Sequence, residues 1–264
     1  MSDESLAPFV LTTEISGSGP AVLLVPAAGA SIEDSFDPLT PLLAKTRTVV
    51  APEYPGCAGA PGADRPLTLD ALADSYVAAA VAAGQDSFTI VGHSLGAAVA
   101  VRAAVRHPER VKGLVLTAGF AKPDHRLRIL TEMTRDCLVR RDFRGYARIM
   151  VVTCVGESLV NQLPTGEIYR ALGEVAELVW PGAEEQFALV QSVDITEDLA
   201  GIDVPTLVIA TMEDTFVSPA NSRFLADAIP GAEYAEIEAG HLLNIAHTDP
   251  WNELIAKFFM EHGI

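Results

Sequence analysis

Apolar residues along the chain gather in short β-rich runs that are separated by longer helix-compatible stretches. These runs lie at Phe9–Ile15, Ala21–Pro26, Thr46–Ala51, Ser87–Val91, Val111–Thr117, Pro205–Ala210 and Glu233–Ile237. Those at 114–116 and 207–209 are continuously apolar, as expected of strands that are covered on both faces. The alternation predicts an α/β fold with a mostly parallel central sheet flanked by helices. The turn-rich segment 16–20 joins the first two runs and predicts an antiparallel hairpin there.

Helix signals lie between the predicted strands. Thr68 can cap a helix that runs through Ala83 and ends at Gly84. Ser218 followed by Pro219 is an N-cap with proline at the first helical position, and that helix is expected to end near residues 230–231.

Between residues 121 and 199 the strand signal disappears and helical periodicity replaces it. Turn residues interrupt this stretch at Gly156, Pro164 and Pro181–Gly182. We therefore expect a core in two parts, residues 1–120 and 200–264, with a helical insertion, residues 121–199, between them.

The composition is that of a globular protein whose partners are not polyanions. The 264 residues are 49% hydrophobic and 20% charged, which suits one domain with an insertion. A formal net charge of −17 disfavours nucleic acid and anionic membranes as main partners, because both attract clustered Lys and Arg. Small-molecule or protein partners remain, and the oligomeric state stays open.

Cysteine usage and the N-terminus predict a cytoplasmic location. Cys57, Cys137 and Cys154 are an odd set without Cys-X-X-Cys spacing, which argues against a disulfide framework and against a zinc site. Met1–Ser5 lacks the basic and apolar regions of a secretory signal, and no apolar run approaches the roughly 18 residues of a membrane span.

One strand runs directly into a tight turn that carries a serine. Phe88–Val91 is followed by Gly92-His93-Ser94-Leu95-Gly96 and then by the Ala-rich segment 97–104. Strand, Gly-X-Ser-X-Gly turn and helix in that order are typical of a nucleophile elbow, in which glycines flank the serine because the turn leaves no room for side chains. His93 is taken as a variable elbow position. The alternative is a glycine-rich βα turn with an incidental serine.

A serine nucleophile needs a base that a third group holds in place, and the sequence offers both. Asp214 follows the predicted strand 205–210, and His241 follows the last predicted strand. The order Ser94, Asp214, His241, with each residue beyond the carboxyl end of a strand, is that of the nucleophile-elbow enzymes. Periodicity does not separate Asp214 from its neighbour Glu213.

These features resemble the α/β-hydrolase superfamily, in the lid-bearing branch that holds small esterases, enol-lactonases, carbon–carbon bond hydrolases and non-heme haloperoxidases. The resemblance covers essentially the whole chain and rests on Gly92–Gly96, the strand at 205–209 with Asp214, Gly240-His241-Leu242 and Asp249-Pro250. It implies a lid inserted after the sixth strand, with Ser94 as nucleophile, Asp214 as orienting acid and His241 as base.

The resemblance also implies an oxyanion hole made by the N–H groups of Leu95 and Ala28. Many relatives have His-Gly where this chain has Pro26-Ala27. A main-chain donor survives a change of side chain, so we expect the hole to persist, with Ala27 as the residue that can tilt its loop. A second departure is Cys57, at a site where relatives often carry histidine, and it is given no role.

The insertion reverses the sign of charge locally. It holds a cluster of arginines: Arg126, Arg128, Arg135, Arg140, Arg141, Arg144 and Arg148. One hypothesis is that some of them attract an anionic substrate; the alternative is ordinary solvated helix faces. Large apolar residues of the insertion must face either the core or a substrate pocket, and the sequence does not sort them: Leu127, Leu130, Met133, Met150, Leu159, Leu163, Leu172, Val179 and Trp180.

The function expected from this sequence is a serine hydrolase that cleaves a carboxylic ester or lactone through an acyl-enzyme. No metal or organic cofactor is expected, because the protein supplies the nucleophile. Thioester hydrolysis, carbon–carbon bond hydrolysis and perhydrolysis use the same triad and remain alternatives. A non-catalytic small-molecule receptor is the alternative from another class, because fold alone does not decide function.

Overall fold

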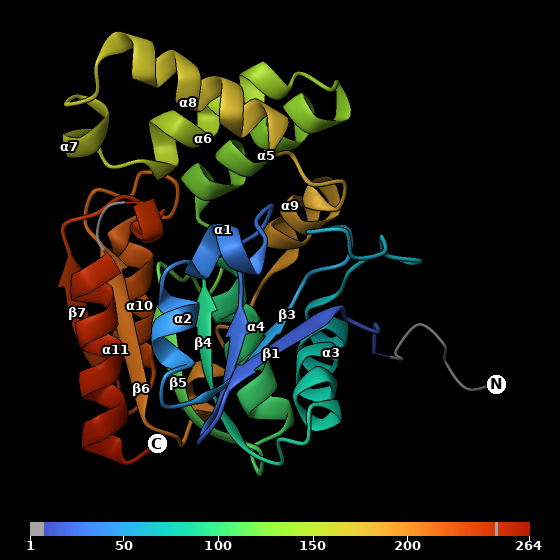
Figure 1. Cartoon of the computed structure of the whole chain (residues 1–264), viewed down its shortest axis with the longest axis vertical. Helices are drawn as coiled ribbons and strands as arrows, with labels where there is room; N and C mark the ends of the chain where they lie inside the picture. The colour runs from blue at the N-terminus through green and yellow to red at the C-terminus, as the bar shows by residue number, and fades with distance from the viewer. Residues whose placement is uncertain (1–7, 246–247) are drawn as a thin grey trace.

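The computed structural model describes residues 8–245 and 248–264, so the prediction drawn from Met1–Ser5 lies outside the described residues. Within them is a seven-stranded sheet of order β1-β3-β2-β4-β5-β6-β7 (Figure 1). Its strands are β1 (Thr13–Gly17), β2 (Ala21–Val25), β3 (Thr48–Pro52), β4 (Phe88–His93), β5 (Val111–Thr117), β6 (Thr206–Thr211) and β7 (Glu233–Ile237). All neighbouring strands are parallel except β1 and β3. The predicted mostly parallel sheet is confirmed.

The predicted hairpin between the first two strands is wrong. β1 pairs with β3, with Thr13 opposite Pro52 and Gly17 opposite Thr48, so that β3 lies between β1 and β2. The reason lies in polarity, because four of the five β1 residues are exposed whereas all five β2 residues are buried. A polar strand suits the edge of the sheet, and a wholly apolar one suits a place with neighbours on both sides.

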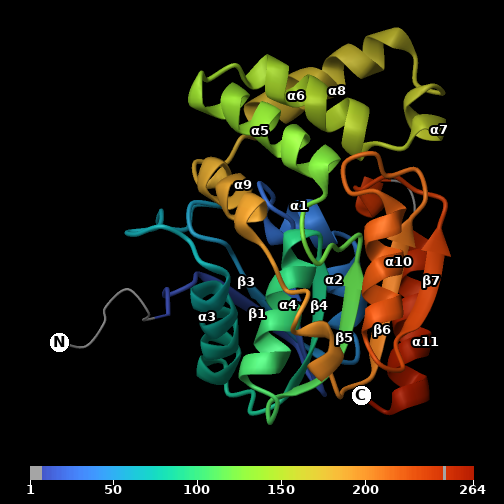
Figure 2. The same ribbon diagram turned by 180° about the vertical axis from the view of Figure 1, so that it is seen from behind.

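Helices cover both faces of the sheet (Figures 1 and 2). One face carries α3 (Leu69–Ala82), α4 (Leu95–Arg106) and α10 (Pro219–Ala228); the other carries α1 (Ile32–Phe36), α2 (Leu39–Leu43) and α11 (Thr248–His262). Alternate residues of β2 point to opposite cores: Leu23 and Val25 join the first, Val22 and Leu24 the second. Two faces covered in this way explain why the inner strands read as continuous apolar runs.

The predicted helix signals have mixed outcomes. Thr68 caps α3, and its hydroxyl accepts a hydrogen bond from Ala71 N–H at 3.2 Å. Ser218 precedes α10, but its side chain makes no capping hydrogen bond. The short helices α1 and α2 were not predicted, because five residues do not span enough turns to show a period.

The insertion between β5 and β6 is helical, as predicted. It consists of α5 (His125–Val139), α6 (Phe143–Cys154), α7 (Glu157–Val160), α8 (Thr165–Glu177) and α9 (Ala183–Ser192). Gly156, Pro164 and Gly182 stand immediately before α7, α8 and α9, so the turn residues did mark helix boundaries. Figures 1 and 2 show these helices stacked over the carboxyl ends of the strands.

The position of the insertion in the strand order needs a correction. In the described part of the chain it follows the fifth strand and not the sixth. The expected number of strands before the insertion, six, came from the family pattern. Here five described strands precede the insertion, and the first of them, β1, is the exposed edge of the sheet. The carboxyl ends of β4, β6 and β7 still meet below the insertion, and the candidate site lies there.

Candidate active site

Ser94 occupies the sharp turn between β4 and α4. Its backbone angles, φ 57° and ψ −115°, are rare for a residue with a side chain. Its N–H donates to the carbonyl oxygen of Thr117 at 2.9 Å, which ties the turn to β5. A Cβ on Gly92 would overlap the carbonyl of Gly96, and one on Gly96 would overlap the carbonyl of Val25. The turn therefore requires both glycines, as the elbow motif predicted.

Asp214 and His241 come together from the loops after β6 and β7. Asp214 Oδ2 lies 2.6 Å from His241 Nδ1, and both side chains are buried. Three further hydrogen bonds hold the carboxylate: Oδ1 accepts the N–H groups of Phe216 and Val217 at 2.8 Å, and the Thr211 hydroxyl donates to Oδ2 at 3.1 Å. Because a carboxylate only accepts hydrogen bonds, Nδ1 of His241 carries a proton, and in the neutral form of this imidazole Nε2 is an acceptor.

The neighbouring acid Glu213 points to another part of the molecule. Its Oε2 accepts hydrogen bonds from the N–H and the hydroxyl of Ser158 in α7, at 2.9 and 2.8 Å. The carboxylate in contact with His241 thus belongs to Asp214, whereas Glu213 joins the loop after β6 to the insertion.

His93 contacts His241, and the sequence, which marked it only as a variable elbow position, did not predict this contact. Its Nε2 donates to the carbonyl oxygen of His241 at 2.9 Å, and the two ring centroids are 4.9 Å apart. Burial, helped by the nearby His241 ring, lowers the pKa of His93 to about 3, so this imidazole stays neutral. The sequence holds one usable signal: the apolar β4 pattern continues to position 93, and a polar residue buried there needs a partner.

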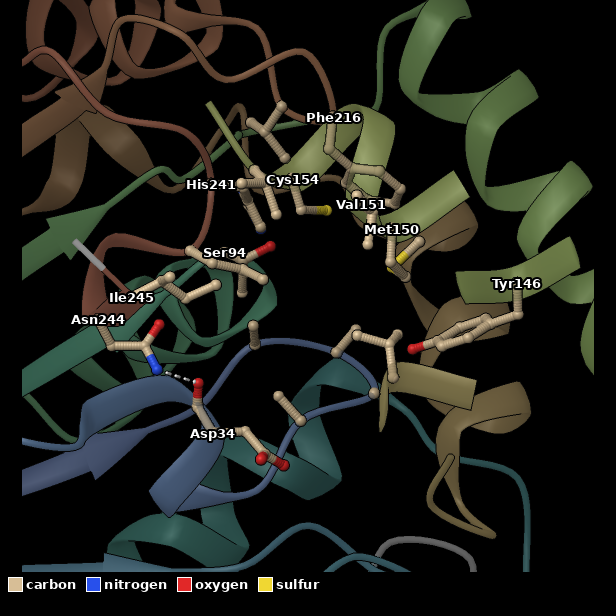
Figure 3. Close-up of a pocket in the computed structure, with 18 of the residues that line it drawn as sticks. Asp34, Ser94, Tyr146, Met150, Val151, Cys154, Phe216, His241, Asn244 and Ile245 are labelled. Carbon is tan, nitrogen blue, oxygen red and sulfur yellow. Dashed lines mark hydrogen bonds between the residues drawn. The ribbon is translucent and has the colours of Figure 1, made fainter. Parts of the chain in front are cut away.

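A cavity of about 350 Å³ lies between the insertion and the strand ends. Ser94, His241 and Ala28 are in its wall, and Figure 3 shows the Ser94 and His241 side chains on the same side of it. Leu95, the other predicted oxyanion residue, opens α4 directly after Ser94. The predicted site residues therefore meet at one end of the sheet. Cys57 is buried but does not line the cavity.

The cavity wall is mostly apolar. Of the insertion residues that the sequence did not sort, Leu127, Met150, Leu159 and Leu163 line the cavity, whereas Met133 is 49% exposed. Among the described residues in the wall, Asp34 is the only acid, and none is a Lys or an Arg. The cavity suits an uncharged group.

The seven arginines between residues 126 and 148 lie outside the cavity wall. Arg135 and Arg140 form salt bridges with acids of the insertion, and Arg126 donates to the carbonyl oxygen of Thr215. Arg144 and Arg148 are exposed on α6. None of the seven lines the cavity, and attraction of an anion from a distance stays a prediction.

Within residues 8–245 and 248–264, no group of three or more His, Cys, Asp or Glu side chains is placed to hold a metal ion. Cys57, Cys137 and Cys154 are free thiols. None of the helices in these same residues combines the length and the apolar character needed to cross a membrane.

Comparisons with known proteins agree with this architecture. Residues 20–248 match the family model described as the alpha/beta hydrolase fold. A pyrrolizixenacetamide deacetylase of Xenorhabdus hominickii is 31% identical over 252 residues, which cover 95% of this chain and 94% of that protein. A pimeloyl-[acyl-carrier protein] methyl ester esterase of Neisseria meningitidis is 31% identical over 242 residues, 90% of this chain and 92% of that protein.

Among solved structures, the enol-lactonase of Burkholderia xenovorans LB400 superposes with a TM-score of 0.80 at 21% identity, over 95% of this chain and 96% of that one. At 21% identity this superposition shows a shared fold only.

Proposed function

The chain belongs to the α/β-hydrolase fold family, and on that premise we propose that it is a serine hydrolase that cleaves a carboxylic ester or lactone through an acyl-enzyme. Ser94 attacks the carbonyl carbon, and His241 takes the hydroxyl proton through Nε2 and later gives it to the leaving group. Asp214 keeps the proton of the neutral imidazole on Nδ1 and stabilises the imidazolium. Water then attacks the acyl-enzyme and releases the acid.

The observation that carries this proposal is the 2.6 Å contact between Asp214 and His241 beside a serine held in an elbow turn. A buried carboxylate with three other hydrogen-bond donors is rigid, so the imidazole it holds has one orientation. The N–H groups of Leu95 and Ala28 are proposed to hold the oxyanion, because one follows the nucleophile and the other lies in the cavity wall.

The apolar wall supports an uncharged acyl or alcohol group as the part of the substrate that enters. A cavity of about 350 Å³ holds a small-molecule substrate, and a carboxylate placed in it would lose its hydration without meeting a cation among the described lining residues. Any charged group of the substrate is therefore proposed to remain outside the cavity.

Amide hydrolysis is a second candidate, favoured by the relative that is named a deacetylase. The same triad serves both reactions, but an amine leaves only when it is protonated, so an amide depends more on proton donation by His241. Matched ester and amide substrates with the same acyl group separate the two candidates.

The proposed function is tested with a serine-reactive fluorophosphonate and a panel of neutral ester, lactone, thioester and amide substrates. We expect one equivalent of label on the Ser94 peptide by mass spectrometry, and steady turnover of at least one ester or lactone. Ser94→Ala should lose the label and lower turnover by on the order of a million-fold, with an unchanged circular dichroism spectrum. An alanine variant that kept more than a few per cent of the activity would overturn the assignment of Ser94.

A further inference from the structure

Gln186 joins the insertion to the loop that carries the proposed oxyanion donor Ala28. It lies in α9 and its side chain is fully buried. Its Oε1 accepts the N–H of Gly29 at 2.7 Å, although the two residues are 157 positions apart in the chain. Its Nε2 donates to the carbonyl oxygen of Pro55 at 3.4 Å and to Cys57 Sγ at 3.2 Å.

The orientation of the Gln186 amide follows from its partners. The Pro55 carbonyl can only accept a hydrogen bond, so it must face the NH₂ group, and the amide oxygen is then left for the N–H of Gly29. Cys57 adds a second acceptor on the same side. Burial raises the pKa of the Cys57 thiol to about 12, which keeps the sulfur a neutral partner. A role for Cys57 thus emerges: it holds Gln186.

A second buried side chain fixes the other end of the loop. Ser35 Oγ, in α1, accepts the N–H of Ala27 at 3.1 Å. At Gly29 the backbone has a φ of 73°, and a Cβ there would lie 2.8 Å from the Phe187 ring, so this position requires glycine. The N–H groups on both sides of Ala28 are therefore occupied. Within the described residues, no acceptor is found for the N–H of Ala28 itself.

We infer that Gln186 is a positioning residue for the reaction: by holding Gly29 it aims the N–H of Ala28 at the site where negative charge develops. The inference rests on the proposed function. It also accounts for the departure at Pro26-Ala27, because a loop held by side chains at both ends does not need the family's glycine at position 27. Helix α9 is thereby part of the catalytic apparatus as well as a wall of the cavity.

The consequence is a particular kinetic signature. An oxyanion donor acts on the transition state more than on the bound substrate, so its displacement lowers kcat and leaves KM nearly unchanged. Full loss of one donor costs about a hundred- to a thousand-fold in kcat, and a donor that is displaced but present should cost less, about ten- to a hundred-fold.

The test compares Gln186→Met, which keeps the length of the side chain but removes its polar atoms, with Gln186→Glu, whose carboxyl group, when protonated, keeps an acceptor for Gly29 and a donor for Pro55. Gln191→Met is the matched control, because Gln191 lies in the same helix and binds Arg135 instead of the loop. Should Gln186→Met fail to fold, Gln186→Asn replaces it, since its amide is one methylene too short to reach Gly29.

For Gln186→Met we expect a loss in kcat of about ten- to a hundred-fold, with KM within roughly threefold of wild type. Affinity for a trifluoromethyl ketone that forms a tetrahedral adduct on Ser94 should fall by a similar factor. Gln186→Glu should recover most of both losses, and Gln191→Met should resemble wild type.

A kcat for Gln186→Met equal to that of Gln191→Met, or an unchanged affinity for the ketone, would overturn the inference and leave the proposed function intact. Equal losses in Gln186→Glu and Gln186→Met would also overturn it, because both would then report on packing. A wild-type protein whose Ser94 takes no fluorophosphonate and turns over no substrate overturns the proposed function, and the inference with it.

Discussion

Asp214 and Glu213 show how adjacent acids acquire different tasks from their contacts. The Asp214 carboxylate meets His241 and is held by two backbone N–H groups, whereas Glu213 binds Ser158 in the insertion. Alternation along a loop carries no information about such contacts, so periodicity did not separate the two acids and the choice of Asp214 rested on the family resemblance. The structure separates them because the backbone after β6 turns one carboxylate inward and the other outward.

The first prediction follows from this difference. Asp214→Asn should lower kcat by about ten-thousand-fold, because an amide NH₂ beside Nδ1 favours the imidazole tautomer that cannot accept the serine proton. Glu213→Gln should cost little, since a glutamine oxygen can still accept from Ser158. Steady-state kinetics of the two variants with one ester provide the measurement. The reverse ranking would move the orienting role to Glu213.

Residue-scale prediction from the sequence rested on the positions of strand ends, and the structure brings the predicted residues together there. Ser94, Asp214 and His241 each follow a predicted strand, and parallel strands present their carboxyl ends at one edge. The contacts of Gln186 and His93 were not predicted for a shared reason: each side chain is hydrogen-bonded to a residue more than a hundred positions away. Nothing in the local sequence specifies such a partner.

At the scale of elements, the insertion divides into a fixed part and a loosely attached part. α6 and α9 are hydrogen-bonded to the core, through Cys154 to the loop of His241 and through Gln186 to the loop of Ala28. In contrast, α7 and α8 contain no buried residue, and α8 packs mainly on α6. Segments with so few buried contacts open at low free-energy cost. Because Ser158 of α7 is hydrogen-bonded to Glu213 in the loop after β6, α8 is the side by which a substrate is expected to enter.

The second prediction uses α8 to test which chain lengths the cavity accepts. Ala171 lines the cavity, and Ala171→Phe should fill part of it. We expect kcat/KM for an octanoyl ester to fall by about tenfold or more, while that for the acetyl ester changes by less than roughly twofold. A series of nitrophenyl esters of increasing acyl length measures this. Equal losses at every length would mean that the acyl group does not reach α8.

Gly173→Ala is the control on the opposite face of the same helix. A Cβ at Gly173 would meet nothing within 4 Å, so the added methyl group changes neither packing nor the cavity. It should leave the chain-length profile as in wild type and raise the free energy of unfolding by about 0.4–1 kcal/mol, because alanine has less backbone freedom in the unfolded chain.

The prediction of elements from the sequence failed for the pairing of β1 and for the short helices α1 and α2. Turn residues marked the boundaries of α7, α8 and α9, because Gly and Pro act on the backbone locally. The hairpin failed because a turn shows where the chain changes direction and says nothing about which strand becomes the neighbour. β1 contacts β3 through residues about 30 to 40 positions apart, and burial of β2 decides that arrangement.

At the scale of the whole molecule, stability responds to pH through buried titratable groups. Burial raises the pKa of Glu53 to about 7, against a smaller opposing effect of the Ile32 N–H that its carboxylate accepts. The folded state therefore binds this proton more strongly than the unfolded chain does. The stabilisation is complete below the unfolded pKa of about 4.5 and is lost as pH rises to about 7.

The third prediction is that Glu53→Gln flattens this part of the pH dependence. The free energy of unfolding of wild type should fall between pH 5 and about pH 8, and that of the variant should fall less. Urea denaturation at intervals across this range provides the comparison, and activity need not be measured. Parallel curves for the two proteins would show that Glu53 titrates alike in the folded and unfolded states.

Net charge also acts at this scale. A charge of −17 repels anions at long range, whereas the arginine cluster of the insertion opposes that field locally. Arg144 and Arg148 are one helical turn apart on the exposed side of α6 and outside the cavity wall. Any influence on a substrate is therefore electrostatic attraction at a distance, which salt screens.

The last prediction tests that attraction with the double variant Arg144→Gln/Arg148→Gln and two esters that differ only in a carboxylate on the part left outside the cavity. If the arginines attract the anion, the variant raises its KM at low salt and leaves turnover of the neutral ester unchanged. Raising the ionic strength from about 0.01 to 0.15 M shortens the Debye length from roughly 30 to 8 Å, so the two proteins should converge. A KM that is equal in both proteins at every salt concentration would assign these arginines to solvated helix faces. The net charge of −17 would then repel the anionic ester without local opposition, and the neutral ester would be the better substrate.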